Sequence, residues 1–261
     1  MNSILYSNII KPEKDNRGII IIIHGFLGMS DNWKTMALKY AEDNYEIHLL
    51  DVRNHGRSFH SDDFSYEIMA EDIKEYCNYH SINQAIFLGH SMGGKIAMQF
   101  ATTYPKYVKK LIVADIAPKY YPPHHQVILE GLNAVDFSKN PTRTEVGEIL
   151  LSFIKDEGVV QFLQKSLYRK SQNELAFRFN LENFNIKIEE IGKELPKAAL
   201  FNGETLFIKG ELSNYIKEHD IEGIKEHFPN ANVVSVSNAG HWLHAENPNE
   251  FYNATINFIN L

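Results

Sequence analysis

The chain has 261 residues, of which 44% are hydrophobic and 23% charged, and its formal net charge is −7. This composition excludes intrinsic disorder, and the length suits one large α/β domain. The negative charge argues against nucleic acid as a partner, and the single cysteine excludes an intrachain disulfide.

The N-terminal segment predicts no export or membrane insertion. Residues 1–18 lack the basic start, apolar middle and small-residue cleavage site of a secretion signal. The longest apolar run, residues 19–23, is far too short to cross a bilayer. We therefore expect a soluble, cytoplasmic protein.

Six short runs of β-branched and apolar residues predict strands buried on both faces. The strongest is GIIIIIHG, which has no polar alternation, as in the strands of a parallel sheet. The runs cover residues 18–25, 46–51, 85–90, 110–115, 205–210 and 232–237.

Helical patterns lie between most of these runs. They cover residues 33–42, 65–80, 94–104, 215–227 and 248–259. Strands that alternate with helices predict an α/β fold whose mostly parallel sheet has helices on both faces.

The interval between residues 115 and 205 breaks this alternation. It contains no comparable strand, and its patterns predict helices at residues 125–135, 142–154, 159–167 and 186–195. Thr142 and Glu145 have the spacing of a capping box. Because open parallel sheets bind ligands beyond the carboxyl ends of their strands, we expect residues 118–195 to form a helical cap over a core of residues 1–117 and 196–261. A packed peripheral subdomain is the alternative.

The stretch LGHSMGGKIA, residues 88–97, matches parts of two motifs. Gly89, Gly94 and Lys95 fit a phosphate-binding loop, but that motif needs Ser or Thr after the lysine, and Ile96 stands there. Gly89, Ser91 and Gly93 fit G-x-S-x-G, which presents a nucleophilic serine on a sharp turn between a strand and a helix. Since a predicted strand precedes Ser91 and a predicted helix follows it, the sequence favours the nucleophile.

Two backbone N–H groups are candidates for stabilising an oxyanion. The N–H of Met92 lies at the start of the predicted helix, where it faces developing negative charge. The N–H of Phe26, in the HGFLG stretch after the first long strand, is the second candidate.

A nucleophilic serine needs a base, and the expected chain order is serine, acid, histidine. His241 follows the last predicted strand after two small residues, and a histidine on that loop can reach Ser91. His244 lies in the same segment but closer to the final helix, which favours a structural or substrate-facing role.

The acid has two candidates. The loop after residues 205–210 has Ser213 and Asn214 where an aspartate is commonly found, with Glu211 nearby. One strand earlier, Asp115 lies at a strand end from which its carboxylate could reach a histidine beside Ser91. We take Asp115 as the predicted acid and keep Glu211 in reserve.

With these residues identified, the chain resembles the α/β-hydrolases, and more narrowly the YbfF-type esterases. The matching stretches are HGFLG, DVRNHGRS, GHSMGGK, DIAP, FRFNLENF and NAGHWLHAENP. Asn54 stands where most α/β-hydrolases have glycine, and the RNHG form is usual in this subfamily. The resemblance implies an acid after the sixth strand, in agreement with Asp115, and hydrolysis of short- to medium-chain acyl esters, with thioesters left open.

The predicted chemistry is acyl transfer to Ser91 from a small-molecule ester, with no cofactor and no metal. A C–C bond hydrolase or cofactor-free lyase with the same three residues is an alternative, as is a ligand-binding receptor on a hydrolase scaffold. Six residues of the predicted cap are candidates for an acyl pocket: Tyr120, Tyr121, His124, Phe153, Phe162 and Phe177. For each of them, packing within the cap is an equal alternative.

Overall fold

Seven strands form one sheet in the computed structural model, which describes residues 4–172 and 174–261. The first three residues of the predicted core and Asn173 of the predicted cap lie outside the described residues. The strands lie in the order β1-β3-β2-β4-β5-β8-β9, and β1 alone among them is antiparallel to its neighbour. Their bounds are Ser7–Ile10 (β1), Ile19–Ile23 (β2), Glu46–Leu50 (β3), Ala85–His90 (β4), Val108–Ala114 (β5), Thr205–Gly210 (β8) and Ala231–Val236 (β9).

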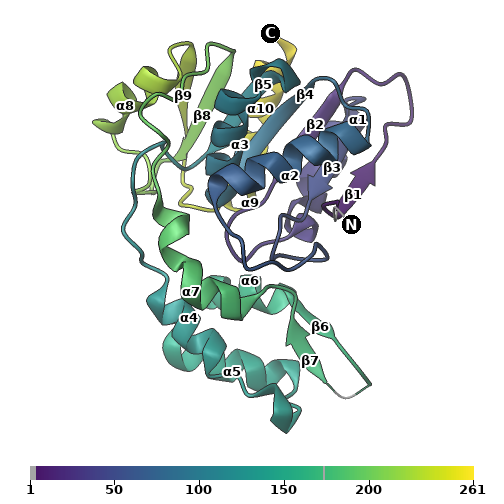
Figure 1. The fold of residues 1–261 in the computed structure, drawn as a ribbon, viewed down its shortest axis with the longest axis vertical. Helices are drawn as coiled ribbons and strands as arrows, with labels where there is room; N and C mark the ends of the chain where they lie inside the picture. Colours follow the sequence, from purple (N-terminus) through teal and green to yellow (C-terminus); the bar gives the residue numbers. More distant parts are fainter. Residues whose placement is uncertain (1–3, 173) are drawn as a thin grey trace.

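Helices cover both faces of this sheet, which confirms the predicted fold class (Figure 1). The helices that pack with the sheet are α1 (Lys34–Glu42), α2 (Tyr66–Tyr79), α3 (Met92–Thr103), α8 (Asp220–His227), α9 (Leu243–Glu246) and α10 (Pro248–Asn260). Successive β2 side chains point to opposite faces. Ile21 and Ile23 therefore pack in the hydrophobic cluster with α2 and α3, while Ile20 and Ile22 pack with α1 and α10.

Short polar motifs begin several of the helices. Ser65 accepts the Ile68 N–H at the start of α2. Thr142 and Glu145 form the predicted capping box at α5 (Arg143–Phe153), which is confirmed. Such caps satisfy N–H groups that have no acceptor within the helix, so the helix boundaries follow from local sequence.

The segment between β5 and β8 lies beyond one edge of the sheet, at the bottom of Figure 1. It contains α4 (Gln126–Asn133), α5, α6 (Glu157–Lys165) and α7 (Leu181–Gly192). It also contains an antiparallel pair of strands, β6 (Leu167–Arg169) and β7 (Leu175–Phe177), where the sequence predicted only helices. Three residues are too few to show a period of two, and Phe177 is held by stacking on Phe179.

One further strand and the starts of two helices differ from the sequence prediction. β1 was not predicted, because its four residues are half-buried and show no apolar run. α7 begins at Leu181, five residues before the predicted start at 186, because Asn180 caps it. α8 begins at Asp220 instead of 215, since Tyr215 packs flat on His241.

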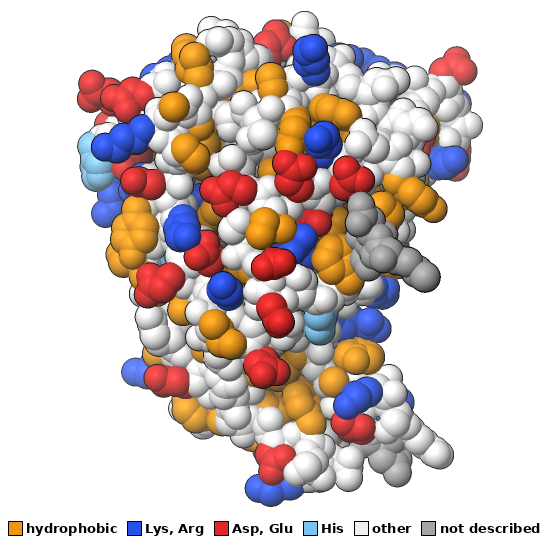
Figure 2. Space-filling model, viewed as in Figure 1, with side chains coloured by type: hydrophobic (Ala, Val, Ile, Leu, Met, Phe, Trp, Pro, Cys, Tyr) orange, Lys and Arg blue, Asp and Glu red, His pale blue; other side chains and the backbone are white. Residues whose placement is uncertain are grey.

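The outer surface mixes the two signs of charge. On the face drawn in Figure 2, acidic and basic side chains are interspersed with scattered hydrophobic ones. No helix of residues 4–172 and 174–261 combines the length and the apolar character needed to cross a membrane.

Candidate active site

Ser91 occupies the sharp turn between β4 and α3. Its φ of 53° lies in the left-handed region that non-glycine residues rarely adopt. A side chain at Gly89 would overlap the carbonyl of Gly93, and one at Gly93 would overlap the carbonyls of Ile23 and His24. The spacing of the two glycines is therefore a steric requirement of this turn, which lifts Ser91 above the carboxyl edge of the sheet.

The structure brings the three sequence-predicted side chains into one hydrogen-bonded line. His241 donates from Nδ1 to Asp115 Oδ2 (2.7 Å), and its Nε2 lies 3.0 Å from Ser91 Oγ. Asp115 is fully buried, and its Oδ1 accepts the N–H of Gly210 (3.1 Å). The carboxylate therefore selects the His241 tautomer whose Nε2 is free to accept the serine proton.

Two residues that follow β8, Ser213 and the reserve candidate Glu211, have other roles. Ser213 donates its hydroxyl to Asp115 Oδ2 (2.5 Å), so it supports the carboxylate instead of replacing it. Glu211 is exposed, and its Oε2 accepts the Asn238 N–H (2.8 Å). Sequence alone left Asp115 and Glu211 open, and the structure brings Asp115 to the imidazole.

Two aromatic rings fix the imidazole and its loop. Tyr215 stacks on His241 with 3.8 Å between ring centroids and 14° between planes. His90 donates from Nε2 to the His241 carbonyl (2.7 Å). Burial lowers the pKa of His90 well below its ordinary value, so this ring stays neutral beside His241. Neither contact was identified from sequence, because the partners are distant along the chain.

His244, the rival base, lies behind the site. It stacks on Trp33 at a centroid distance of 4.0 Å, and burial lowers its pKa to about 3. Its buried Nδ1 has no hydrogen-bond partner among the described residues. The ring is therefore neutral and packed, in keeping with a structural role.

Phe26 and Met92, whose N–H groups were predicted to bind an oxyanion, line the same cavity as Ser91. Neither donates to another group in the described part of the chain. The loop that carries Phe26 is held by His55, whose Nε2 accepts the N–H of Leu27 (3.2 Å). Burial lowers the pKa of His55 well below its ordinary value, so the ring is neutral and can accept this bond. Two free N–H groups in fixed positions could bind a developing oxyanion.

Two cavities lined by Ser91 are also lined by side chains of the segment between β5 and β8. Of the six residues proposed for an acyl pocket, Tyr121, His124 and Phe162 line these cavities. Tyr120 and Phe153 are exposed, and Phe177 packs among other aromatic rings of that segment. These three do not line the cavities.

Lys95, the lysine of the partial phosphate-loop motif, makes structural contacts. Its side chain is fully buried, and Nζ donates to the carbonyls of Lys119 (2.6 Å), Gly192 (3.3 Å) and Lys193. These carbonyls belong to the two chain segments that leave and re-enter the sheet. Lys95 therefore ties both segments to α3, and its ammonium cannot reach a phosphate at the turn.

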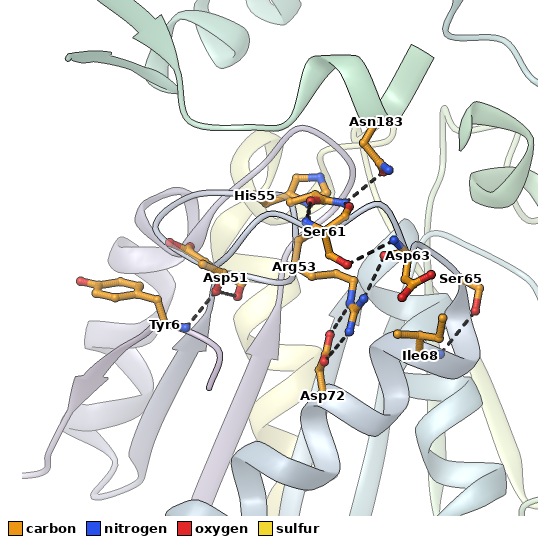
Figure 3. A network of polar contacts seen from close by, with 12 residues as sticks. Tyr6, Asp51, Arg53, His55, Ser61, Asp63, Ser65, Ile68, Asp72 and Asn183 are labelled. Atoms are coloured by element: carbon orange, nitrogen blue, oxygen red, sulfur yellow. Dashed lines mark hydrogen bonds and ion pairs between the residues drawn. The ribbon is translucent and has the colours of Figure 1, made fainter. Parts of the chain in front are cut away.

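The loop after β3 forms a polar network on one side of the site. Asp51 accepts hydrogen bonds from the backbone N–H groups of Ser30 (2.6 Å) and Arg57 (2.8 Å). Arg53 forms a two-pronged ion pair with Asp72 of α2, at 2.5 and 2.7 Å (Figure 3). These contacts fix the loop that carries His55, and through it Leu27.

Asn54 connects this loop to the start of α7. Its φ of 64° explains why glycine fits the same position in other sequences. Its amide contacts Ser61 and donates to Asn183 Oδ1 (3.0 Å), and its carbonyl accepts the N–H of Asn180 (2.9 Å). Figure 3 shows Asn183 reaching toward the loop from the neighbouring ribbon.

Within residues 4–172 and 174–261, no group of three or more histidine, cysteine or carboxylate side chains could hold a metal ion.

Comparisons with known proteins show the family and the fold of this chain. A family model described as alpha/beta hydrolase fold matches residues 18–138. The chain is 40% identical over 246 residues to a Haemophilus influenzae protein named as an esterase/lipase, covering 94% of this chain and 84% of that one. It is 33% identical over 247 residues to Esterase YbfF of Escherichia coli, covering 94% of each. A solved structure described as a marine microorganism esterase matches with a TM-score of 0.94 and 39% identity, over 98% of this chain and 100% of that one.

Proposed function

The chain belongs to the α/β-hydrolase family of carboxylic-ester hydrolases, and we propose that Ser91, His241 and Asp115 hydrolyse short- to medium-chain acyl esters through an acyl-enzyme. The observation that carries this proposal is the unbroken line of hydrogen bonds from buried Asp115 through His241 to Ser91. A line of this kind at a strained turn, beside two free N–H groups, is what acyl transfer requires.

In the first step Ser91 Oγ forms a bond to the acyl carbon while its proton passes to His241 Nε2. Asp115 stabilises the imidazolium, and the N–H groups of Phe26 and Met92 bind the oxyanion. The bond from the acyl carbon to the alcohol oxygen then breaks, and His241 returns the proton to that oxygen.

Water completes the cycle by the same route. His241 takes a proton from water as the water oxygen bonds to the acyl carbon. The bond to Ser91 Oγ breaks, and Oγ recovers the proton as the carboxylic acid leaves. The products are one acid and one alcohol.

We also propose that residues 118–195 act as a cap that bounds the substrate site. This role is supported by the side chains of α4, α6 and α7 that line the cavities around Ser91. Side chains from outside the sheet exclude water and supply apolar contacts for an acyl substrate.

The test is hydrolysis of p-nitrophenyl acetate by wild type, Ser91→Ala, Asp115→Asn and Glu211→Gln. We expect Ser91→Ala to abolish turnover. Asp115→Asn should lower kcat by about 10⁴-fold, because the amide no longer selects the His241 tautomer whose Nε2 accepts the serine proton. Glu211→Gln, which keeps the shape of an exposed side chain, should match wild type. Loss of activity in Glu211→Gln with activity retained in Asp115→Asn would contradict the proposed acid.

A further inference from the structure

Two cavities of very different size share Ser91 in their lining. One has a volume of about 20 Å³ and the other about 650 Å³, and both are lined by Phe26, Ser91 and Tyr215. A volume of about 20 Å³ holds little more than one water-sized group. An ester bound at Ser91 has two arms, so each cavity can receive one of them.

The position of His241 decides which arm enters which cavity. In the proposed mechanism His241 protonates the leaving oxygen, so the alcohol must depart on the side of the imidazole. His241 and Trp242 line the large cavity but not the small one. The small cavity is instead lined by Ile116 and by Met92, whose N–H binds the oxyanion in the proposed mechanism. The acyl chain therefore points into the small cavity.

The walls of the small cavity are tied in place. Ile188 and Ile191 of α7 line it, together with Tyr66 and Tyr121. Tyr66 donates its hydroxyl to the carbonyl of Ile191 (2.6 Å). The N–H of Tyr121 donates to the carbonyl of Gly192 (2.8 Å), which also accepts from the buried Lys95. Widening this cavity would break several buried hydrogen bonds, which is costly.

The walls of the large cavity carry aromatic side chains as well as charged ones from Asp156, Lys165 and Glu246. Trp33, Phe162 and Trp242 line it, and Phe162 lies against Trp242 with 5.9 Å between centroids. The aromatic part of these walls favours a bulky hydrophobic group, because burying its surface drives binding.

We propose that this esterase selects esters that combine a short acyl group, of acetyl size, with a bulky hydrophobic alcohol. The inference rests on the proposed function and specifies its substrate class. Ile188 is a specificity-determining residue of the acyl side, and Phe162 is one of the alcohol side.

Two isomeric esters test the assignment. Octyl acetate and ethyl octanoate have the same atoms and both release an aliphatic alcohol, and they differ only in which arm is long. We expect kcat/KM, followed by acid release at constant pH, to be about tenfold or more higher for octyl acetate.

Three variants locate the selection. Ile188→Ala should raise kcat/KM for ethyl octanoate, because it enlarges the acyl side. Phe162→Ala should lower kcat/KM for octyl acetate, because it removes an alcohol-side wall. Ile186→Ala is the matched control, since Ile186 lies on the same helix, is 71% exposed and lines neither cavity. It should leave the ratio of the two isomers unchanged.

The possible outcomes separate the two proposals. Hydrolysis that depends on Ser91, with ethyl octanoate equal to or better than octyl acetate, would overturn the assignment of the cavities and leave the esterase function standing. Hydrolysis of neither isomer, or hydrolysis that survives Ser91→Ala, would overturn the function and this inference with it.

Discussion

Lys95 places an ammonium group inside the protein, one turn along α3 from Ser91. Burial lowers its pKa from 10.5 to about 7, with Glu194 opposing this shift and Lys119 adding to it. The rings of Tyr66 and Tyr121 face the charge at 5.9 and 5.0 Å. Three carbonyl acceptors and two ring faces replace part of the water that the ammonium loses.

Lys95 should make stability depend on pH in a defined direction. Between about pH 7 and 10.5 the unfolded chain binds more protons at this residue than the folded one, so folding stability rises with pH. We expect the unfolding free energy of wild type, minus that of Lys95→Met, to increase by a few kcal/mol across this pH window. Each unit by which the folded and unfolded pKa values of Lys95 differ contributes about 1.4 kcal/mol. Urea unfolding at pH 6, 8 and 10 measures it.

An exposed lysine provides the control for this pH dependence. Lys106→Met changes a lysine that is exposed, so its difference from wild type should not vary with pH in this way. A Lys95→Met difference that stays constant from pH 6 to 10 would show that the buried amine does not titrate below its ordinary range.

At the scale of elements, the turn between β4 and α3 depends on what surrounds it. Gly89 and Gly93 are required because carbonyls of β2 and α3 approach their Cα atoms. The loop after β3 is tied in a similar way, since Asn54 joins it to the start of α7. Both connections bring separate segments to the same edge of the sheet.

Replacing Asn54 separates its side-chain contacts from its backbone conformation. Asn54→Gly keeps a residue that adopts positive φ but removes the amide contacts to Ser61 and Asn183. We expect unfolding free energy to fall by about 1–2 kcal/mol, as measured by chemical denaturation.

Asn140→Gly supplies the matched control. Asn140 also has a positive φ, of 52°, but it is exposed at the end of a short helical turn. This change should leave stability equal or slightly higher. If the two substitutions changed the unfolding free energy equally, the side-chain amide of Asn54 would contribute nothing to stability.

At the scale of the whole molecule, the core sheet and the segment between β5 and β8 share one hydrophobic cluster. Ile21 and Phe87 of the sheet belong to the same cluster as Leu132, Val146 and Phe184 of that segment. Burial of shared apolar surface couples the stability of the two parts.

We therefore expect one cooperative unfolding transition. Far-ultraviolet circular dichroism follows helices throughout the chain, and tryptophan fluorescence follows Trp33 against the sheet and Trp242 beside Phe162. The two midpoints in guanidinium should coincide. An earlier fluorescence transition would show that the segment separates from the sheet before the sheet unfolds.

The sequence by itself determined the order of strands and helices, the turn at Ser91 and the family. These features depend on residues close together in the chain: β-branched runs, caps such as Thr142 with Glu145, and glycines two positions from a serine. The short strands β1, β6 and β7 escaped prediction because three or four residues carry too little pattern.

Only the tertiary structure decided which distant groups meet. The imidazole of His241 is hydrogen-bonded to Asp115 and not to Glu211, and Lys95 reaches carbonyls almost a hundred positions away. Ser91 lines two cavities of unequal size. Each of these depends on how segments far apart in sequence pack at one edge of the sheet. A local pattern fixes the conformation of a segment, but the distance between two segments follows from the packing of the whole core.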